Sequence, residues 1–144
     1  MTVKAILSRK GGDVVTIAPT ASLTDAVKLL AERRIGALVV TGPDNRVAGI
    51  LSERDIVRSV AERGHAALEE NVGTVMTRKV TTCTEADTIA VLMERMTEGK
   101  FRHLPVVDQG RLVGVISIGD VVKWRVGEIE NESAALREYI ATLA

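Results

Sequence analysis

Two short stretches of this chain place a serine three residues before an aspartate. Ser52 precedes Asp55 and Ser117 precedes Asp120, each time after a short apolar run that opens with glycine. At a helix start, free backbone N–H groups and a serine hydroxyl can hold a phosphate. A carboxylate one turn further on, with two acceptor oxygens, suits the two hydroxyls of a ribose. Together these groups could hold one nucleotide along the start of a helix.

The same spacing also has a structural interpretation. A serine with an acidic residue three positions later is a variant of the helix capping box, and an acidic first turn suits the helix dipole. For one such pair, capping is the better interpretation. Its recurrence at equivalent places favours the nucleotide, and both interpretations stay open at this point.

The recurrence belongs to a longer internal repeat. Gly-Ile-Leu-Ser-Glu-Arg-Asp-Ile-Val at residues 49–57 returns 65 positions later as Gly-Val-Ile-Ser-Ile-Gly-Asp-Val-Val at 114–122. Upstream, Val15-Thr16 returns as Val80-Thr81 at the same offset, whereas Leu38-Val39-Val40 returns as Leu104-Pro105-Val106, shifted by one. We attribute this shift to two insertions of opposite sign. The chain is therefore a duplication, with repeat one at 1–68, including an N-terminal lead segment, and repeat two at 69–144.

Each repeat predicts the order β-α-β-β-α. The expected strands cover residues 14–17, 37–40 and 47–51 in repeat one, and residues 80–82, 104–107 and 112–116 in repeat two. Ser22 and Asp87 are expected to cap the first helix of each repeat, and the last helices begin at Ser52 and Ser117. One unit has too small a core to be stable by itself. We therefore expect an α/β (α+β) fold in which two units pack sheet to sheet with pseudo-two-fold symmetry.

The whole pattern resembles a tandem pair of cystathionine-β-synthase-type (CBS) domains, also called a Bateman module. The resemblance rests on residues 49–55 and 114–120, on Val75-Met76-Thr77 before the second copy, and on residues 101–107, Phe-Arg-His-Leu-Pro-Val-Val, within it. It implies a stand-alone regulatory protein that binds AMP, ADP, ATP or NAD(H) in the cleft between the repeats. In this family the aspartate takes the ribose and the serine or threonine contacts phosphate. The protein that it would regulate is not specified by the sequence.

Carried over by position, the resemblance implies two groups of ligand-binding residues. The first group is Thr16, Ile17, Ala37, Ser52 and Asp55. The second group is Val80, Thr81, Arg102, His103, Leu104, Pro105, Ser117 and Asp120. Arg102 offers forked, charged donors for phosphate, and His103 adds another donor. At the equivalent place repeat one has Gly36 and Ala37, which offer no side-chain donor. We therefore expect the second site to hold phosphate more tightly.

The last helix is predicted to run past the end of the repeat. From Ser117 to Ala144 it could extend about 40 Å. Positions spaced alternately by four and three along it are apolar except for one serine, a set that we call the seam: Val122, Val126, Ile129, Ser133, Leu136, Ile140 and Leu143. This is the coiled-coil period. Packing of the helix on its own domain would explain why the first seam positions are apolar. The outer half of the seam has no such core to cover, so we predict that it forms a homodimer contact.

The composition argues against several other classes of protein. Lys plus Arg equals Asp plus Glu, at 19 each, and the chain has one Phe, one Tyr and one Trp. Neither charge nor stacking platforms favour nucleic acid as a partner. No apolar run reaches the 18 residues of a membrane span. With a single cysteine, Cys83, and no signal-like start, the expected location is the cytoplasm.

Residues for catalysis are also missing from the sequence. Cys83, His65 and His103 have neither an evident catalytic partner nor the spacing of a zinc site. We expect no enzyme activity, no catalytic cofactor and no metal. The rival hypothesis is a protein-interaction or assembly module with vestigial ligand sites, in which Asp55 and Asp120 serve as helix caps.

Overall fold

The computed structural model describes residues 1–143. Its helices and strands, with the 3₁₀ turns η1 and η2, are α1 (Val3–Lys10), β1 (Thr16–Ile17), α2 (Leu23–Arg33), β2 (Ala37–Thr41), η1 (Pro43–Asn45), β3 (Val47–Ser52), α3 (Glu53–Arg63), η2 (Gly64–Glu69), α4 (Val72–Val75), α5 (Ile89–Gly99), β4 (His103–Asp108), β5 (Arg111–Ser117) and α6 (Ile118–Thr142).

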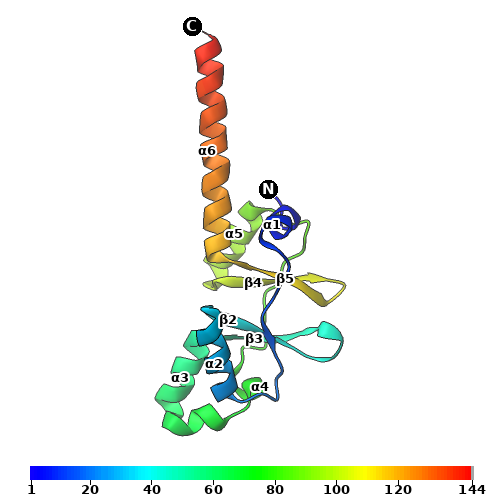
Figure 1. The fold of residues 1–144 in the computed structure, drawn as a ribbon, viewed down its shortest axis with the longest axis vertical. Coiled ribbons are helices and arrows are strands. Elements are labelled where there is room, and N and C mark those ends of the chain that lie inside the picture. Colours follow the sequence, from blue (N-terminus) through cyan, green and yellow to red (C-terminus); the bar gives the residue numbers. More distant parts are fainter. Residues whose placement is uncertain (144) are drawn as a thin grey trace.

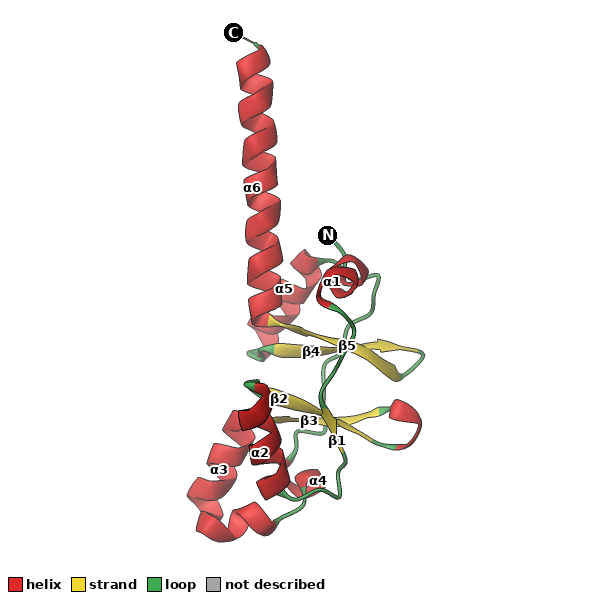
Figure 2. Cartoon of the chain, viewed as in Figure 1, coloured by secondary structure: helices red, strands yellow, loops and turns green. Residues whose placement is uncertain are grey.

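Two small sheets face each other at the centre of the molecule (Figure 2). In one sheet β1 pairs in parallel with β2, which pairs antiparallel with β3, and in the other β4 pairs antiparallel with β5. The helices lie outside this stack, with α2, α3 and α4 on one side and α1, α5 and the base of α6 on the other (Figure 1). The Asn45 side chain joins the sheets near the hairpin turns, donating to the Leu112 carbonyl at 2.9 Å. The predicted α+β fold with two packed sheets is confirmed.

The predicted first strand of repeat two is wrong. Residues 80–82 form no strand, and pairing with β4 shrinks to one parallel bridge between Cys83 and Val106. The Cys83 N–H donates to the Pro105 carbonyl and its own carbonyl accepts from Val107, both at 2.9 Å. To continue the ladder, Thr81 would need an N–H at position 105, and proline has none.

The strand register also corrects the alignment of the repeats. Ile17 pairs with Val40 and Cys83 with Val106, so Ile17 and Cys83 are equivalent and lie 66 positions apart, the offset that also relates Leu38 to Leu104. The offset changes to 65 after the hairpin turn. One residue fewer in the second hairpin therefore accounts for the shift, and two insertions are not needed.

The predicted cap of α5 is wrong by one position. Thr88, the equivalent of Ser22, is the N-cap and accepts from the Val91 N–H at 3.3 Å. Asp87 instead accepts from the Thr84 N–H and from Arg95, each at 2.8 Å. The aspartate therefore closes the turn ahead of the helix and does not cap it.

The lead segments that open the two repeats, residues 1–15 with α1 and residues 69–81 with α4, are exchanged in space. Val3 and Ile6 of α1, ahead of repeat one, are fully buried in the core of repeat two, with Ile89 and Leu92 of α5. Conversely, α4, ahead of repeat two, contributes Val72 to the core of repeat one. Each repeat thus completes its core with a helix from the other half of the sequence. The division between residues 68 and 69 stays a prediction.

The last helix projects far beyond the body (Figure 1). α6 begins after its N-cap Ser117 and contains 25 residues, and Ala144 of the predicted helix lies outside the described residues. We expected the body to cover the first seam positions, but Val122 and Val126 are exposed. The body instead covers the face of Val121 and Trp124. Within residues 1–143 no helix is apolar over a length that could cross a membrane.

The exchange predicts that a mutation in α1 destabilises repeat two. Ile6→Ala removes a fully buried side chain and should lower the free energy of unfolding by about 2–4 kcal/mol. Trp124, the sole tryptophan, packs against the same cluster, so its fluorescence in a urea titration reports the loss. Ser8→Ala, at an exposed position of the same helix, should change stability by less than about 0.5 kcal/mol. Equal effects of the two changes would contradict the packing of α1.

Candidate functional site

Asp55 is a buried carboxylate at the start of α3, with 7% of its surface exposed. Its Oδ2 accepts from the Ser52 N–H at 3.0 Å and from the Ser52 hydroxyl at 3.1 Å, while the Ser52 Oγ accepts from the Asp55 N–H at 3.2 Å. The capping box that the sequence suggested is therefore formed. Ser117 and Asp120 form the same box at the start of α6.

A third group reaches Asp55 from the lead segment of repeat two. The Thr77 hydroxyl donates to Asp55 Oδ1 at 3.3 Å. Thr77 is held there by two backbone hydrogen bonds with Ile50 of β3, at 2.9 and 3.0 Å. A Cβ at Gly49 would lie 2.8 Å from the Thr77 carbonyl oxygen, so this approach requires glycine. The exchanged lead segment thus forms one wall of the space around Asp55.

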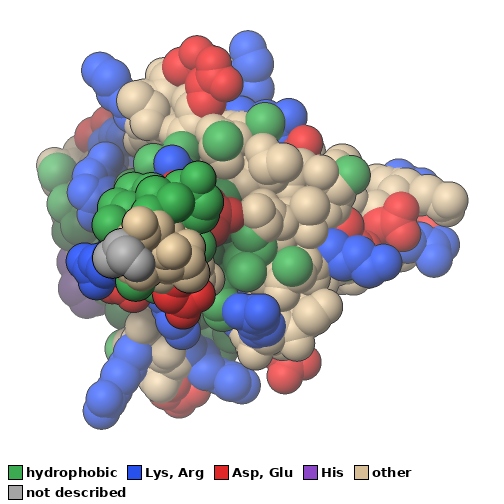
Figure 3. Space-filling view, turned by 90° about the horizontal axis from the view of Figure 1, so that it is seen from above, with side chains coloured by type: hydrophobic (Ala, Val, Ile, Leu, Met, Phe, Trp, Pro, Cys, Tyr) green, Lys and Arg blue, Asp and Glu red, His purple; other side chains and the backbone are tan. Residues whose placement is uncertain are grey.

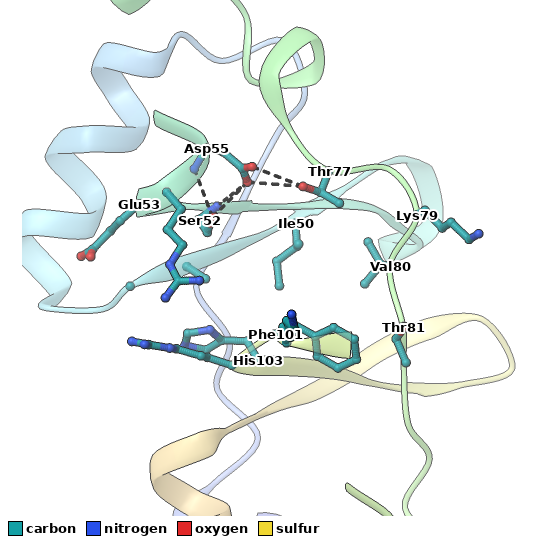
Figure 4. Close-up of a pocket in the computed structure, with 15 residues that line it drawn as sticks. Ile50, Ser52, Glu53, Asp55, Thr77, Lys79, Val80, Thr81, Phe101 and His103 are labelled. Atoms are coloured by element: carbon teal, nitrogen blue, oxygen red, sulfur yellow. Dashed lines mark hydrogen bonds between the residues drawn. The ribbon is translucent and has the colours of Figure 1, made fainter. Parts of the chain in front are cut away.

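A hollow of about 260 Å³ opens between the two sheets beside Asp55 (Figure 4). Its volume is slightly below the range for small-ligand pockets, which begins at about 300 Å³. Three parts of the chain line it: Gly36, Ala37, Ile50, Ser52, Glu53, Arg54 and Asp55 from repeat one; Thr77, Lys79, Val80 and Thr81 from the lead segment; and Lys100, Phe101, Arg102 and His103 ahead of and within β4. In Figure 4 Ile50 lies on one sheet, and Phe101 lies across the hollow from it. The hollow therefore combines apolar walls, a carboxylate and several cations.

The structure groups the predicted site residues differently from our expectation. Val80, Thr81, Arg102 and His103, expected with Asp120, line the Asp55 hollow. The exchange explains Val80 and Thr81, because the segment that enters repeat two runs past β3 of repeat one. Arg102 and His103 reach the hollow because the start of β4 faces repeat one across the two sheets (Figure 4). Ala37, Ser52 and Asp55 of the first group line the same hollow.

Four other predicted residues lie within the strands. Thr16 and Ile17 form β1, and Ile17 packs on the core of repeat one. Leu104 and Pro105 are buried in β4. None of the four lines the Asp55 hollow or the hollow beside Ser117 as the structure describes them. Their role in binding stays a prediction.

The hollow next to Ser117 differs in its charge. It has a volume of about 210 Å³ and is lined by Lys10 together with Val14, Val15 and Ile35. The Lys10 ammonium pairs with Asp120 at 2.5 Å and also donates to the Val115 carbonyl at 3.0 Å. Burial raises the pKa of Asp120, but hydrogen bonds from Lys10 and the Ser117 backbone outweigh it and hold the pKa below its ordinary value. Asp120 is therefore ionised and already paired.

His103 lies between the two hollows and contributes to both. Burial lowers the pKa of its imidazole, and the positive charges of Lys10 and Arg102 lower it further against the opposing charge of Asp120. At neutral pH the ring is therefore uncharged and offers one N–H donor. It becomes a cation on acidification below its ordinary range.

Several lining residues were not among the predicted site residues. Ile50, Thr77, Lys79 and Phe101 all line the Asp55 hollow. Ile50, Thr77 and Phe101 belong to stretches that carried the family resemblance, so their positions held a usable signal. Lys79 becomes a neighbour of the site through the exchange, which residue spacing does not reveal.

Two other predictions concern reactive and metal-binding groups. Cys83 is buried, and burial, with a further contribution from the charge of Asp87 against that of Arg95, raises the pKa of its thiol to about 12. A thiol in this state is a poor nucleophile. Among residues 1–143, no cluster of three or more His, Cys, Asp or Glu side chains is arranged to hold a metal ion.

Comparison with known proteins gives matches over both repeats. The family model for the CBS domain matches residues 3–62 and 72–127. The mitochondrial CBS domain-containing protein CBSX3 of Arabidopsis thaliana is 38% identical over 120 residues, covering 81% of this chain and 58% of that protein. The chain covers 21% of another relative from the same plant, CBSCBSPB5. It thus spans part of the length of these relatives.

Solved structures show the same fold. The CBS-domain containing protein ATU1752 from Agrobacterium tumefaciens is 50% identical with a TM-score of 0.83, over 87% of this chain and 99% of that one. The CBS domain protein PAE2072 from Pyrobaculum aerophilum, solved in complex with AMP, is 32% identical with a TM-score of 0.74, over 83% and 89%. The CBS domain pair of MJ0100, solved with 5′-methylthioadenosine and S-adenosyl-L-methionine, is 25% identical with a TM-score of 0.79, over 89% and 98%.

The two family matches cover the two repeats with their lead segments, and the second match ends within α6. The paired capping boxes and facing sheets are also common to both halves of the chain. The chain therefore belongs to the CBS domain family and carries two CBS domains in tandem.

Proposed function

We propose that this chain is a regulatory module that binds an adenine nucleotide in the hollow beside Asp55, and that it is not a catalyst. The observation that carries the proposal is the state of Asp55. It is a buried carboxylate whose contact from the opposite wall is the Thr77 hydroxyl, and Arg58, the exposed cation near it, remains 3.9 Å away. A carboxylate held by hydroxyl groups can exchange them for the hydroxyls of a ribose.

The other walls of the hollow suit the rest of a nucleotide. Ile50 and Phe101 offer apolar surface for an adenine ring, and Arg102 and Lys79 offer charged donors for phosphate. The ligands of the two structural relatives support this choice, because AMP, 5′-methylthioadenosine and S-adenosyl-L-methionine all contain adenosine. AMP, ADP, ATP and NAD(H) share that unit with them, so the proposal covers all four.

The Asp55 hollow is the stronger candidate of the two. Arg102 and His103, which we had assigned to the Asp120 site, contribute to it. In the other hollow Lys10 already neutralises Asp120, and a ribose hydroxyl would have to compete with an ammonium ion. We therefore propose tighter binding beside Asp55, the reverse of the order expected from the sequence.

Regulation would follow from the position of the ligand between the repeats. Asp55 and Ser52 belong to repeat one, whereas Phe101 and Arg102 belong to repeat two. A ligand that contacts both sides stabilises the relative orientation in which these contacts form best. The module would thereby convert nucleotide concentration into a shift between orientations, for a partner of unknown identity.

Asp55→Ala should weaken AMP binding much more than Asp120→Ala. Hydrogen bonds to a charged group contribute about 1.5–3 kcal/mol, so we expect a loss of about ten- to one-hundredfold for Asp55→Ala. Asp120→Ala is the matched control, since each aspartate completes a capping box and costs its helix a similar amount. Isothermal titration calorimetry with dialysed protein would measure both dissociation constants.

The same titrations also test the class of function. AMP, ATP and NADH should each be tried on the wild type, with thermal melts in parallel, because a ligand that binds the folded state raises its stability. If none of the three gives heat or shifts the melt, the nucleotide proposal is wrong and the assembly-module hypothesis gains support.

Arg102→Ala should weaken AMP binding about tenfold and leave adenosine binding nearly unchanged, because the guanidinium would contact the phosphate. Arg46→Ala is the control, an exposed arginine of the β2–β3 hairpin. Competition titrations with both ligands would measure the difference. Equal losses for the two arginines would remove Arg102 from the site.

Binding of AMP should depend on pH through His103. The pKa of the His103 imidazole lies below its ordinary value of about 6.5. The ring therefore gains a proton, and with it a positive charge, only when the pH falls below about 6.5. The affinity of the wild type should therefore gain on that of His103→Gln as the pH falls from about 7.5 to about 5.5. Comparing the two proteins at each pH cancels the titration of the AMP phosphate itself. If the ratio stays constant down to the lowest pH at which both proteins remain folded, His103 does not face the phosphate.

A further inference from the structure

The seam of α6 is an exposed apolar face. Its six apolar members, Val122, Val126, Ile129, Leu136, Ile140 and Leu143, are each between 47% and 67% exposed. Viewed down the helix, hydrophobic side chains gather at its free end (Figure 3). Isolated exposed apolar residues are ordinary, but a continuous row at coiled-coil spacing marks an interaction surface.

The body of the same chain cannot cover this face. It packs against the other side of α6, where Val121 is buried and Trp124 lies on the core of repeat two. The amino group of Met1 pairs with Glu128 on that side at 2.7 Å. In the heptad defined by the seam, Trp124 and Glu128 take the f and c positions, which lie away from the a and d positions. The described part of this chain therefore leaves the seam uncovered.

We propose that a second copy of this chain covers the seam, and that the two α6 helices lie parallel and in register as a two-stranded coiled coil. The seam residues then take alternating d and a positions, starting with Val122 at d. At 1.5 Å per residue the 25 residues of α6 give a contact of about 37 Å. This proposal does not depend on nucleotide binding.

Charge complementarity selects both the partner and the direction. In a parallel pair, a g residue faces the e residue five positions later on the other helix. Arg125 would then face Glu130 of the second copy, and Glu132 would face Arg137, and two-fold symmetry repeats both pairs. The two attractive pairs arise from this chain's own sequence, which is what a homodimer requires.

An antiparallel pair with full overlap would reverse these interactions. There, g faces g and e faces e, so that Glu130 meets Glu130 and Glu132 meets Glu132 near the centre. Lys123 would also meet Arg137. Like charges in these positions are destabilising. Ser133 adds to the specificity, since a single polar residue at an a position fixes the register in which it meets its own copy.

A disulfide test reads out the direction. In a parallel, in-register pair the two Ser133 positions face each other across the axis, at a distance that a disulfide can span. Ser133→Cys in the full chain should form a covalent dimer under mild oxidation, seen on a non-reducing gel. Ala135→Cys, two positions along and outside the seam, is the matched control and should form no covalent dimer on the same gel. Native Cys83 is buried and is present in both variants.

The oligomeric state and its charges provide a second measurement. Analytical ultracentrifugation of the wild type should show a dimer. Glu132→Arg places two arginines together at each pair and should weaken dimerisation by roughly two- to tenfold, and adding Arg137→Glu should restore it. Glu138→Arg, at an outward position of the same helix, should have no effect.

Either of two results would overturn the proposal. One is a wild type that sediments as a monomer, and the other is failure of Ser133→Cys to cross-link in preference to Ala135→Cys. Circular dichroism of each variant confirms that α6 is folded. Because none of the changed residues lines the Asp55 hollow, AMP titration of the same variants separates this proposal from the proposed function.

Discussion

The arrangement of the molecule depends on a pair of backbone hydrogen bonds between Ile50 and Thr77. They fasten the lead segment of repeat two to the edge of β3, and they require the absence of a side chain at Gly49. Just before this point, α4 packs into the core of repeat one. After it, the chain runs past the sheets towards repeat two. The same constraint places the Thr77 hydroxyl on Asp55. Fold and site are therefore fixed by one local contact.

The two halves share one fold, but the aspartate of each capping box has a partner of different charge. Both carry a serine–aspartate capping box with closely similar distances. In one half the carboxylate meets a neutral hydroxyl, and in the other it meets the Lys10 ammonium. The difference comes from the two lead segments, because α1 ends with Lys10, whereas Met76 stands at the equivalent position after α4. A symmetric fold thus holds two unequal hollows.

Sequence reasoning identified what is encoded locally and failed where the chain crosses between repeats. The order of elements within repeat one, the facing sheets, the capping boxes at Ser52 and Ser117 and the length of α6 follow from spacing and periodicity. The lead helices α1 and α4 were not predicted. The missing strand at residues 80–82 was in principle readable, since Pro105 lacks the N–H that the ladder needs. The regrouping of Arg102 and His103 with Asp55 was not readable, because it results from the way the two sheets face each other, which the repeat pattern does not specify. Likewise, the sequence shows the seam, but the side of α6 that the body covers depends on the rotation of the helix about its axis.

The exchanged lead segments also bear on how such a chain could arise. A single unit with its own lead helix could build the same core packing by domain swapping with an identical copy, since α1 and α4 play matching parts. Gene duplication and fusion would turn that intermolecular swap into an intramolecular one, replacing dependence on protein concentration with a high effective concentration. After fusion, the two halves would no longer need to have the same sequence. Lys10 and Thr77 could then diverge separately, which no symmetric homodimer of a single unit permits.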